Sequence, residues 1–341
     1  MLHGTVTAHR TARVLWPVVG ALCLGTTMPL VPGPASASTS ASMLALCGNP
    51  GSPPVGVRHV LVVVLENQTY GSVVGPHSKA PYQSGTLAKQ CGLAAEMFGV
   101  THTSAANYLA MSAGTYPPKT VNGCATVAAC SSSSANLYQQ LETSGAGWKS
   151  YQESMPSSCY PFGTSAYKIG HNPALFYALA SCPSLDVAVP DLTAQSGALW
   201  TDLSSQTLPG FSVVTPNLNH DGEGATHLAG ADAWLKKFLG TVAQSPAYQS
   251  GSTAVLVTYD EGTGADAVKG EDCTNAALDL AGAQPSCHIP AFVVYPWASG
   301  TDATFFDHYS VTRMVEELFG LPLLAGASQA TSMLGHFGLA A

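Results

Sequence analysis

Two pairs of adjacent polar residues stand where an apolar run of this sequence stops. Glu66-Asn67 directly follows HVLVVVL, and Asp260-Glu261 directly follows AVLVTY. In open α/β sheets, ligands bind beyond the carboxyl ends of the strands. Adjacent carboxylates repel each other, and a cation between them would relieve that repulsion. We therefore expect a divalent metal ion, of unspecified identity and number, held by these four residues. The alternative is that both pairs are solvated turns.

A serine starts a predicted helix in the segment THTSAANYLAMSAG. Ser104 is expected at the N-cap of a helix from about Ala105 to Ala113, which Gly114 would end. A hydroxyl at this place lies in the positive end of the helix dipole, where free N–H groups bind phosphate. Asn107, one turn further, could present its amide to the same anion. The alternative is a capping serine with no further function.

Histidines and polar residues gather after a third apolar run, FSVVT. The following loop contains Asn217, His220, Asp221 and His227 within eleven residues. His308 directly precedes another predicted helix and is either functional or structural. Acidic and imidazole side chains of this kind, placed after a buried strand, are candidates for a metal or phosphate site.

Taken together, these residue types suit the hydrolysis of a small phosphoester. Hard oxygen ligands hold a divalent cation, and a serine hydroxyl serves as nucleophile. The oxygen of Ser104 would attack phosphorus in line, and water would then hydrolyse the phosphoserine. Asn107, the helix N–H groups and the histidines would stabilise the equatorial oxygens.

Such a site requires strands that run through the core of one sheet. Continuous apolar runs without alternation predict central strands covered on both faces. The fold class expected from them is α/β, with a mostly parallel central sheet. The expected strands are 59–65, 97–100, 148–152, 211–215, 254–259 and 289–296, and an amphipathic helix is expected over 228–243.

The first 37 residues are predicted to be a signal peptide. They contain no Asp or Glu, and Arg10 and Arg13 precede an apolar run that ends near small residues, with cleavage near Ala37. Pro17 and Pro29 interrupt the run, which disfavours a stable membrane anchor. Residues 38–57 are expected to be a disordered lead-in, and 58–341 one domain with a loop-rich cap at about 116–206.

Charge and cysteine usage agree with a secreted protein. The chain has 12 Lys+Arg and 20 Asp+Glu, so nothing attracts nucleic acid. Eight of the nine cysteines remain after loss of Cys23, and no pair has CxxC spacing. An even count in an exported chain favours four disulfides. Pairing of sequence neighbours predicts 47–91, 124–130, 159–182 and 273–287.

Six successive blocks of the sequence resemble the bacterial phosphoesterase family, which includes secreted acid phosphatases and phosphocholine-type phospholipases C. The blocks lie in the same order over about 60–322: ENQTYGSVVG, THTSAANYLAMSAG, PNLNHDGEGATHLAGADAWL, VTYDEG, HIPAFVVYP and HYSVTRMVEELFGLP. The resemblance implies an alkaline-phosphatase-like three-layer sandwich. It also implies Ser104 as nucleophile, His220 and His288 as phosphate-side histidines, and a metal bound by Glu66, Asn67, Asp260 and Glu261.

The sequence leaves three functions open. The leading one is a phosphate monoesterase of acid-phosphatase type. A phospholipase C acting on phosphodiesters would need an apolar rim, which Tyr160, Phe162, Phe176 and Tyr177 could supply. The third is a non-catalytic exported binding protein. Ala105-Ala106 stands where the family often has prolines, which bears on substrate preference. A sulfatase is disfavoured, because no Cys-x-Pro-x-Arg block is present. The sequence does not indicate an oligomeric state.

Overall fold

A single eight-stranded sheet organises the fold. The computed structural model describes residues 15, 17, 43–223, 227–276 and 280–340. The strand order is β4-β3-β5-β1-β6-β7-β2-β8. Only β7 runs antiparallel to its neighbours in this sheet, β6 and β2. The strands are β1 His59–Leu65, β2 Gly92–Phe98, β3 Trp148–Glu153, β4 Asp186–Val189, β5 Phe211–Thr215, β6 Thr253–Tyr259, β7 His288–Val294 and β8 Gly300–Asp307.

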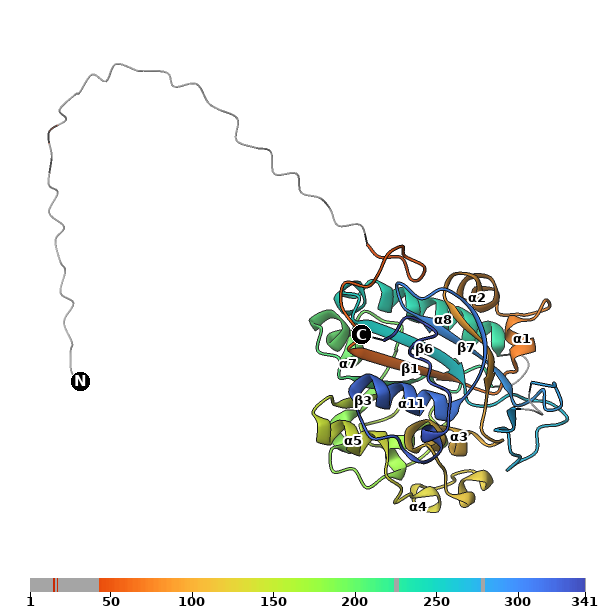
Figure 1. The fold of residues 1–341 in the computed structure, drawn as a ribbon. Helices are drawn as coiled ribbons and strands as arrows, with labels where there is room; N and C mark the ends of the chain where they lie inside the picture. Colours follow the sequence, from red (N-terminus) through yellow and green to blue (C-terminus); the bar gives the residue numbers. More distant parts are fainter. Residues whose placement is uncertain (1–14, 16, 18–42, 224–226, 277–279, 341) are drawn as a thin grey trace, which may run out of the picture. The chain divides into compact units, whose positions relative to one another are not determined.

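Helices cover both faces of this sheet (Figure 1). Helices α3, α5 and α11 lie on one side of the strands, and α7 and α8 lie on the other. The three strands at the centre, β5, β1 and β6, are almost entirely buried because both of their faces are covered. The helices are α1 Tyr70–Val74, α2 Ala88–Gln90, α3 Ser104–Ala113, α4 Val127–Cys130, α5 Leu137–Ser144, α6 Cys182–Leu185, α7 Gly197–Ser205, α8 Leu228–Ala243, α9 Pro246–Gln249 and α11 His308–Phe319. Short helical turns are η1 Gln83–Leu87, η2 Pro118–Asn122, η3 Ile169–His171, η4 Pro173–Phe176 and η5 Ala325–Ser328.

The bounds expected for the central elements agree with the structure. The runs at 59–65 and 211–215 form β1 and β5, and the amphipathic segment forms α8. None of the helices among the described residues is long and apolar enough to cross a membrane. The predicted signal peptide lies outside the described residues, apart from Leu15 and Pro17.

Residues 43–57 differ from the disordered lead-in expected for 38–57, because they are bonded to the domain. Cys47 forms a disulfide with Cys91. The N–H of Gly48 donates to the carbonyl of Ala298 at 3.1 Å, and the N–H of Asn49 donates to the carbonyl of Pro296 at 2.8 Å. The bridge was expected from cysteine order, but the polar, glycine-rich composition did not reveal the two hydrogen bonds, since the backbone makes them.

Residues 116–206 also differ from the expected cap. This segment supplies β3 and β4, which extend the central sheet beyond β5. Two parts of it line the pocket described below, Gly123–Cys124 and the residues around η3. The strand expected at 148–152 is β3, and its polar residues Gln152 and Glu153 are buried in the sheet.

All four predicted disulfides are present. They join Cys47 to Cys91, Cys124 to Cys130, Cys159 to Cys182 and Cys273 to Cys287. Pairing of sequence neighbours was sufficient here because each bridge closes a local loop, the longest spanning 44 residues. Disulfides of this number are typical of proteins that fold in an oxidising compartment.

Candidate active site

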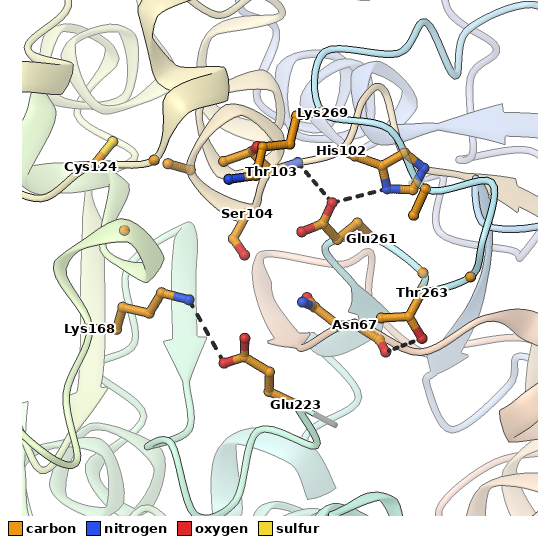
Figure 2. Close-up of a pocket in the computed structure, with 16 residues that line it drawn as sticks. Asn67, His102, Thr103, Ser104, Cys124, Lys168, Glu223, Glu261, Thr263 and Lys269 are labelled. Atoms are coloured by element: carbon orange, nitrogen blue, oxygen red, sulfur yellow. Dashed lines mark hydrogen bonds and ion pairs between the residues drawn. The ribbon is translucent and has the colours of Figure 1, made fainter. Parts of the chain in front are cut away.

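A pocket of about 430 Å³ opens beyond the carboxyl ends of β1 and β6 (Figure 2). Its walls come from six places in the chain: the segment after β1, the segment that begins α3, the residues after η2, the segment around η3, the loop after β5, and the loop after β6. Labelled lining residues include Asn67, His102, Thr103, Ser104, Lys168, Glu223, Glu261, Thr263 and Lys269. The edge of the sheet at which the sequence predicts a site therefore carries a cavity large enough for a small molecule.

Ser104 is the first residue of α3 and points into this pocket. The preceding residue, Thr103, has a φ of 145°, and its N–H donates to Oε2 of Glu261 at 2.8 Å. The Ser104 hydroxyl donates to Oε2 of Glu66 at 3.2 Å. Ser104 thus lies at the positive end of a ten-residue helix and within hydrogen-bond reach of a carboxylate that could accept its proton.

Glu66 is fully buried and held on both carboxylate oxygens. Its Oε1 accepts a hydrogen bond from the hydroxyl of Tyr108 at 2.7 Å, and Nδ1 of His171 lies 3.2 Å from the same oxygen. Burial, followed by the positive charge of Lys168, holds the pKa of His171 well below its usual value. A neutral imidazole and a phenol therefore fix the orientation of the Glu66 carboxylate.

Asn67 and Asp260 converge on Glu66. The backbone N–H of Asn67 donates to Oδ1 of Asp260 at 3.1 Å. The terminal amide of Asn67 lies 3.3 Å from Oε2 of Glu66, and 3.0 and 3.3 Å from the two carboxylate oxygens of Asp260. With its nitrogen inward, this amide donates to both acids; with its oxygen inward, it joins them as a further hard donor. Asn67 has a φ of 48°, a left-handed conformation that asparagine tolerates better than most residues.

Three buried carboxyl groups with raised pKa values lie together here. Burial, with the charges of Asp260 and Asp221, raises the pKa of Glu66 well above its usual value. Burial and the neighbouring Glu261 raise the pKa of Asp260 to about 7. Burial raises the pKa of Asp221 to about 6, and its Oδ2 has no hydrogen-bond partner among the described residues. Such a concentration of desolvated negative charge favours a bound cation.

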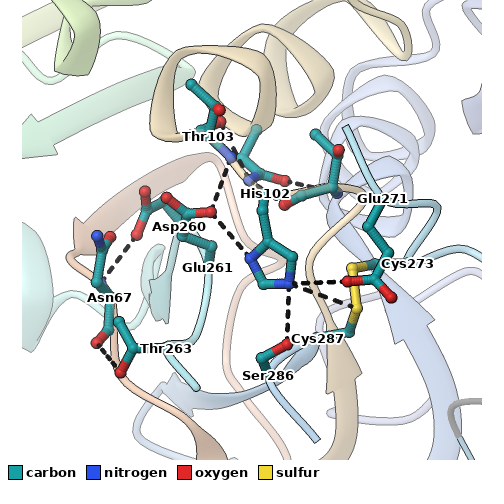
Figure 3. Close-up of polar contacts among 12 residues, drawn as sticks. Asn67, His102, Thr103, Asp260, Glu261, Thr263, Glu271, Cys273, Ser286 and Cys287 are labelled. Carbon is teal, nitrogen blue, oxygen red and sulfur yellow. Dashed lines mark hydrogen bonds and ion pairs between the residues drawn. A yellow bond between two sulfur atoms is a disulfide. The ribbon is translucent and has the colours of Figure 1, made fainter. Parts of the chain in front are cut away.

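Glu261, expected as a metal ligand, lines the pocket and uses one carboxylate oxygen to hold the start of α3 (Figure 3). Besides accepting from Thr103, its Oε2 lies 3.1 Å from Nδ1 of His102, with which it forms a hydrogen bond. On the other side of the ring, Nε2 of His102 lies 3.0 Å from Oγ of Ser286. This series of hydrogen bonds, Ser286–His102–Glu261–Thr103, fixes the backbone at the N-terminus of α3, where Ser104 lies.

Lys168 is a cation on the opposite wall from this chain (Figure 2). Its Nζ lies 3.8 Å from Oε2 of Glu223. Burial alone would lower the pKa of Lys168, but Glu66, Glu223, Asp260 and Asp221 raise it overall. Lys168 therefore stays protonated and faces the carboxylate cluster.

Asn107 and His308 bond to each other away from the pocket. Oδ1 of Asn107 accepts from the backbone N–H groups of Val100 and Thr101, at 3.0 and 3.3 Å, and lies 3.0 Å from Nδ1 of His308. Nε2 of His308 bonds to the carbonyl of Tyr259 at 3.0 Å, and burial lowers the pKa of His308 to about 4. The Asn107 amide therefore does not face the pocket beside Ser104. It instead holds the loop before α3 through its hydrogen bonds to the backbone.

The other predicted histidines also lie elsewhere. His220 forms a hydrogen bond of 2.8 Å with Glu153 and lines a separate cavity beside Trp234. Asn217 bonds to Ser154, and His227 is exposed at the start of α8. His288 stacks between Tyr70 and Phe98, and its Nε2 bonds to the carbonyl of Ala95 at 2.7 Å. Of the lower-ranked candidates, only Asp221 joins the acidic cluster.

The donor set suits a hard divalent cation. Carboxylate and amide oxygens from Glu66, Asn67 and Asp260 are the ligands that Mg²⁺, Mn²⁺ and Ca²⁺ prefer. Among the described residues, two tighter groups of potential ligands exist, His102 with Cys273 and Cys287, and Asp186 with Cys159 and Cys182. Both contain the two sulfurs of a disulfide, which cannot act as thiolate ligands.

Several residues of the site were not predicted from the sequence. Tyr108 and His171 orient Glu66, and Lys168 and Glu223 form the far wall of the pocket. Tyr108 lies one helical turn after Ser104 on α3, so its proximity follows from helix geometry. Nothing in the sequence around Lys168 and His171 indicates that this irregular segment returns to the site.

The fold is similar to that of solved proteins of the alkaline phosphatase superfamily. A protein of that superfamily from Vibrio parahaemolyticus superimposes with a TM-score of 0.54 over 82% of this chain and 71% of its own, at 15% identity. The lipoteichoic acid synthase LtaP from Listeria monocytogenes gives 0.51 over 82% and 76%, at 12% identity. At such identities the likeness shows the fold alone, and it confirms the alkaline-phosphatase-like α/β sandwich that the resemblance implies.

The sequence gives the narrower assignment. The Phosphoesterase family profile matches residues 77–322, and the chain belongs to this family. It is 26% identical to a probable acid phosphatase of Kluyveromyces lactis, over 78% of this chain and 59% of that protein. It is 28% identical to a phosphate-repressible acid phosphatase of Penicillium chrysogenum, over 70% and 54%. A phosphatidylinositol-3-phosphatase of Mycobacterium tuberculosis is 27% identical over 82% and 83%. The chain thus spans little more than half the length of the two fungal relatives. The expected family and enzyme class, a hydrolase of phosphoric esters, agree with this assignment.

Proposed function

We propose that this protein is a secreted, metal-dependent phosphoesterase that hydrolyses phosphate monoesters through Ser104. The observation that carries the proposal is the 3.2 Å hydrogen bond from the Ser104 hydroxyl to Glu66, at the floor of an open pocket. The acid phosphatases among its relatives support a monoester substrate. The four disulfides support export from the cell.

The side chains around Ser104 divide the chemistry between them. A divalent cation held by Glu66, Asn67 and Asp260 would offset the charge of the phosphate and lower the pKa of the serine hydroxyl. The Ser104 hydroxyl gives its proton to Glu66 as its oxygen attacks phosphorus, the bond to the ester oxygen breaks, and the leaving alkoxide takes a proton from water. Water then attacks the phosphoserine, which releases phosphate and restores the hydroxyl.

Two positive features of the pocket would hold the transferred phosphoryl group. The N-terminus of α3 presents the positive end of its dipole beside Ser104. Lys168 faces the carboxylate cluster and remains charged, so it can neutralise an equatorial oxygen. Its partner Glu223, 3.8 Å away and half-exposed, keeps the lysine in place before substrate enters.

A phosphodiesterase of phospholipase C type is the competing function, and the expected aromatic rim is incomplete. Phe162 is 65% exposed and contacts Tyr160 edge-on. Phe176 and Tyr177, however, are buried in the core at 1% and 5% exposure. Only two of the four aromatic residues are available at the surface, which favours the monoesterase.

Assay of the purified protein separates the candidates. We expect hydrolysis of p-nitrophenyl phosphate, slower release from p-nitrophenyl phosphorylcholine, and loss of both activities in EDTA with recovery on adding a divalent metal. Faster release from the phosphorylcholine diester would assign a phospholipase C. A properly folded protein that hydrolyses neither compound at any metal concentration would be a binding protein, and the proposal would be withdrawn.

A further inference from the structure

The pocket has two cationic side chains in its wall. It is lined by two lysines, Lys168 and Lys269, which come from different loops. Figure 2 shows Lys168 on the side of Glu223 and Lys269 on the side of Thr103, with Ser104 between them in this view. The volume of about 430 Å³ exceeds what a phosphoryl group fills, so most of the pocket is available to the rest of the substrate.

The two lysines have different electrostatic surroundings. Lys168 interacts with four carboxyl groups, those of Glu66, Glu223, Asp260 and Asp221. Its positive charge therefore acts at the carboxylate cluster beside Ser104, where the phosphoryl group would be transferred. Within the described part of the chain, the side chain of Lys269 has no carboxylate at ion-pair distance. Lys269 thus lines the pocket and can pair its positive charge with an anionic ligand.

Acids on the same loop as Lys269 are engaged elsewhere. Oδ2 of Asp266 accepts from the N–H of Ser286 at 2.8 Å. Oε1 of Glu271 accepts from Nε2 of Gln284 at 2.7 Å, and its Oε2 lies 3.7 Å from His102. Neither of these carboxylates lies at ion-pair distance from the Lys269 ammonium.

The backbone of this loop is fixed to the segment that leads into α3. Lys269 forms an isolated parallel β-bridge with His102, and the N–H of Gly270 donates to the carbonyl of His102 at 3.2 Å. The N–H of Cys273 donates to the carbonyl of Val100 at 3.1 Å, and the Cys273–Cys287 disulfide closes the loop (Figure 3). The backbone of Lys269 is therefore held next to His102, which lies two residues before Ser104.

We infer that the pocket selects phosphomonoesters whose leaving group carries a second anionic group, a carboxylate or another phosphate, and that Lys269 binds it. This inference rests on the proposed function, because it assigns a substrate class to the same site. A cation that faces an anion across a partly open pocket discriminates against neutral analogues by its charge. Lys269 is accordingly a specificity-determining residue.

The experiment compares two substrates that differ in one group. 3-Phosphoglycerate carries a carboxylate where glycerol 3-phosphate has a neutral alcohol, and phosphate release is measured for both. We expect the wild type to prefer 3-phosphoglycerate in kcat/KM. Lys269→Gln should lower the ratio of the two kcat/KM values about five- to tenfold, the amount expected of one partly exposed ionic contact. Lys269→Arg should recover most of the ratio, and salt should weaken it.

Two further variants serve as controls. Lys168→Gln should lower kcat/KM for both substrates alike, because it faces the transferred phosphoryl group. Lys236→Gln, an exposed lysine of α8 remote from the pocket, should change neither value. Circular dichroism and thermal melting confirm that each variant is folded. An equal loss for both substrates in Lys269→Gln, or no loss, overturns the inference and leaves the phosphoesterase intact. A wild type that hydrolyses neither p-nitrophenyl phosphate nor these substrates overturns both.

Discussion

Replacing Ser104 with alanine is expected to lower kcat for p-nitrophenyl phosphate by about 10³-fold or more, the loss typical when a nucleophile is removed. The hydroxyl at the start of α3 bonds to Glu66 and opens into the pocket. The change removes one hydroxyl and leaves the helix intact, so thermal stability should stay within a few degrees of the wild type.

Ser112→Ala is the matched control for this variant. Ser112 lies on the same helix, is also buried, and bonds to the carbonyl of Tyr108 and the hydroxyl of Tyr177 rather than facing the pocket. It should keep most of its activity at a small cost in stability. Comparable turnover in Ser104→Ala and the wild type would show that the nucleophile lies elsewhere.

Asp260→Asn is expected to reverse its effect on stability according to whether metal is present. In EDTA at pH 8, the variant should be more stable than the wild type by about 2–4 kcal/mol, because a buried carboxylate with a pKa of about 7 must ionise in the folded wild type. The unfolded pKa lies near 4, so the folded wild type binds the extra proton between about pH 4 and 7. Its metal-free stability should therefore rise as the pH falls through this range, and the advantage of the variant should disappear near pH 4.

With saturating divalent metal the order should invert. A ligand that binds only the folded state stabilises it by about 4 kcal/mol when its concentration is 1,000 times its Kd. Asp260→Asn removes a metal ligand, so the variant should lose this stabilisation and also its activity. Chemical denaturation in EDTA and in metal, at pH 5 and 8, gives the four values. Asp232→Asn is the control: Asp232 is a buried carboxylate that accepts two backbone N–H groups at 2.9 Å, so its loss should be destabilising in every condition. If Asp260→Asn were less stable than the wild type in EDTA at pH 8, the raised pKa of Asp260 and the destabilisation derived from it would be contradicted.

The central fold could be predicted from the sequence because buried parallel strands are continuous apolar runs. The run HVLVVVL gave β1 with its correct bounds, and the disulfides followed from cysteine order. The edge strand β8, GTDATFFD, was not predicted, since it is partly exposed and mixes polar residues with aromatic ones. Strand β4 is only four residues long and begins with a buried aspartate. Edge and short strands depend on pairing with a neighbour, and such pairing is not visible in a single segment.

The residues of the candidate site also fall into two groups, those that follow central strands and those in loops or helices. Residues at the ends of central strands, such as Glu66 and Asp260, were identified because the chain direction there is fixed by the sheet. Asn107 and His220 have suitable chemistry, yet each turns to a local partner, the backbone before α3 in one case and Glu153 in the other. A sequence gives the type of a side chain in a loop or helix but not the direction in which it points. Lys168 was missed because it comes from an irregular segment.

The most direct measurement is the position of the metal in crystals grown with Mn²⁺, located from its anomalous scattering. The account predicts a peak between the side chains of Glu66, Asn67 and Asp260, at about 2.0–2.3 Å from their oxygens and facing the Ser104 hydroxyl. Fully occupied manganese bound only elsewhere, with no peak between these three side chains, would contradict it.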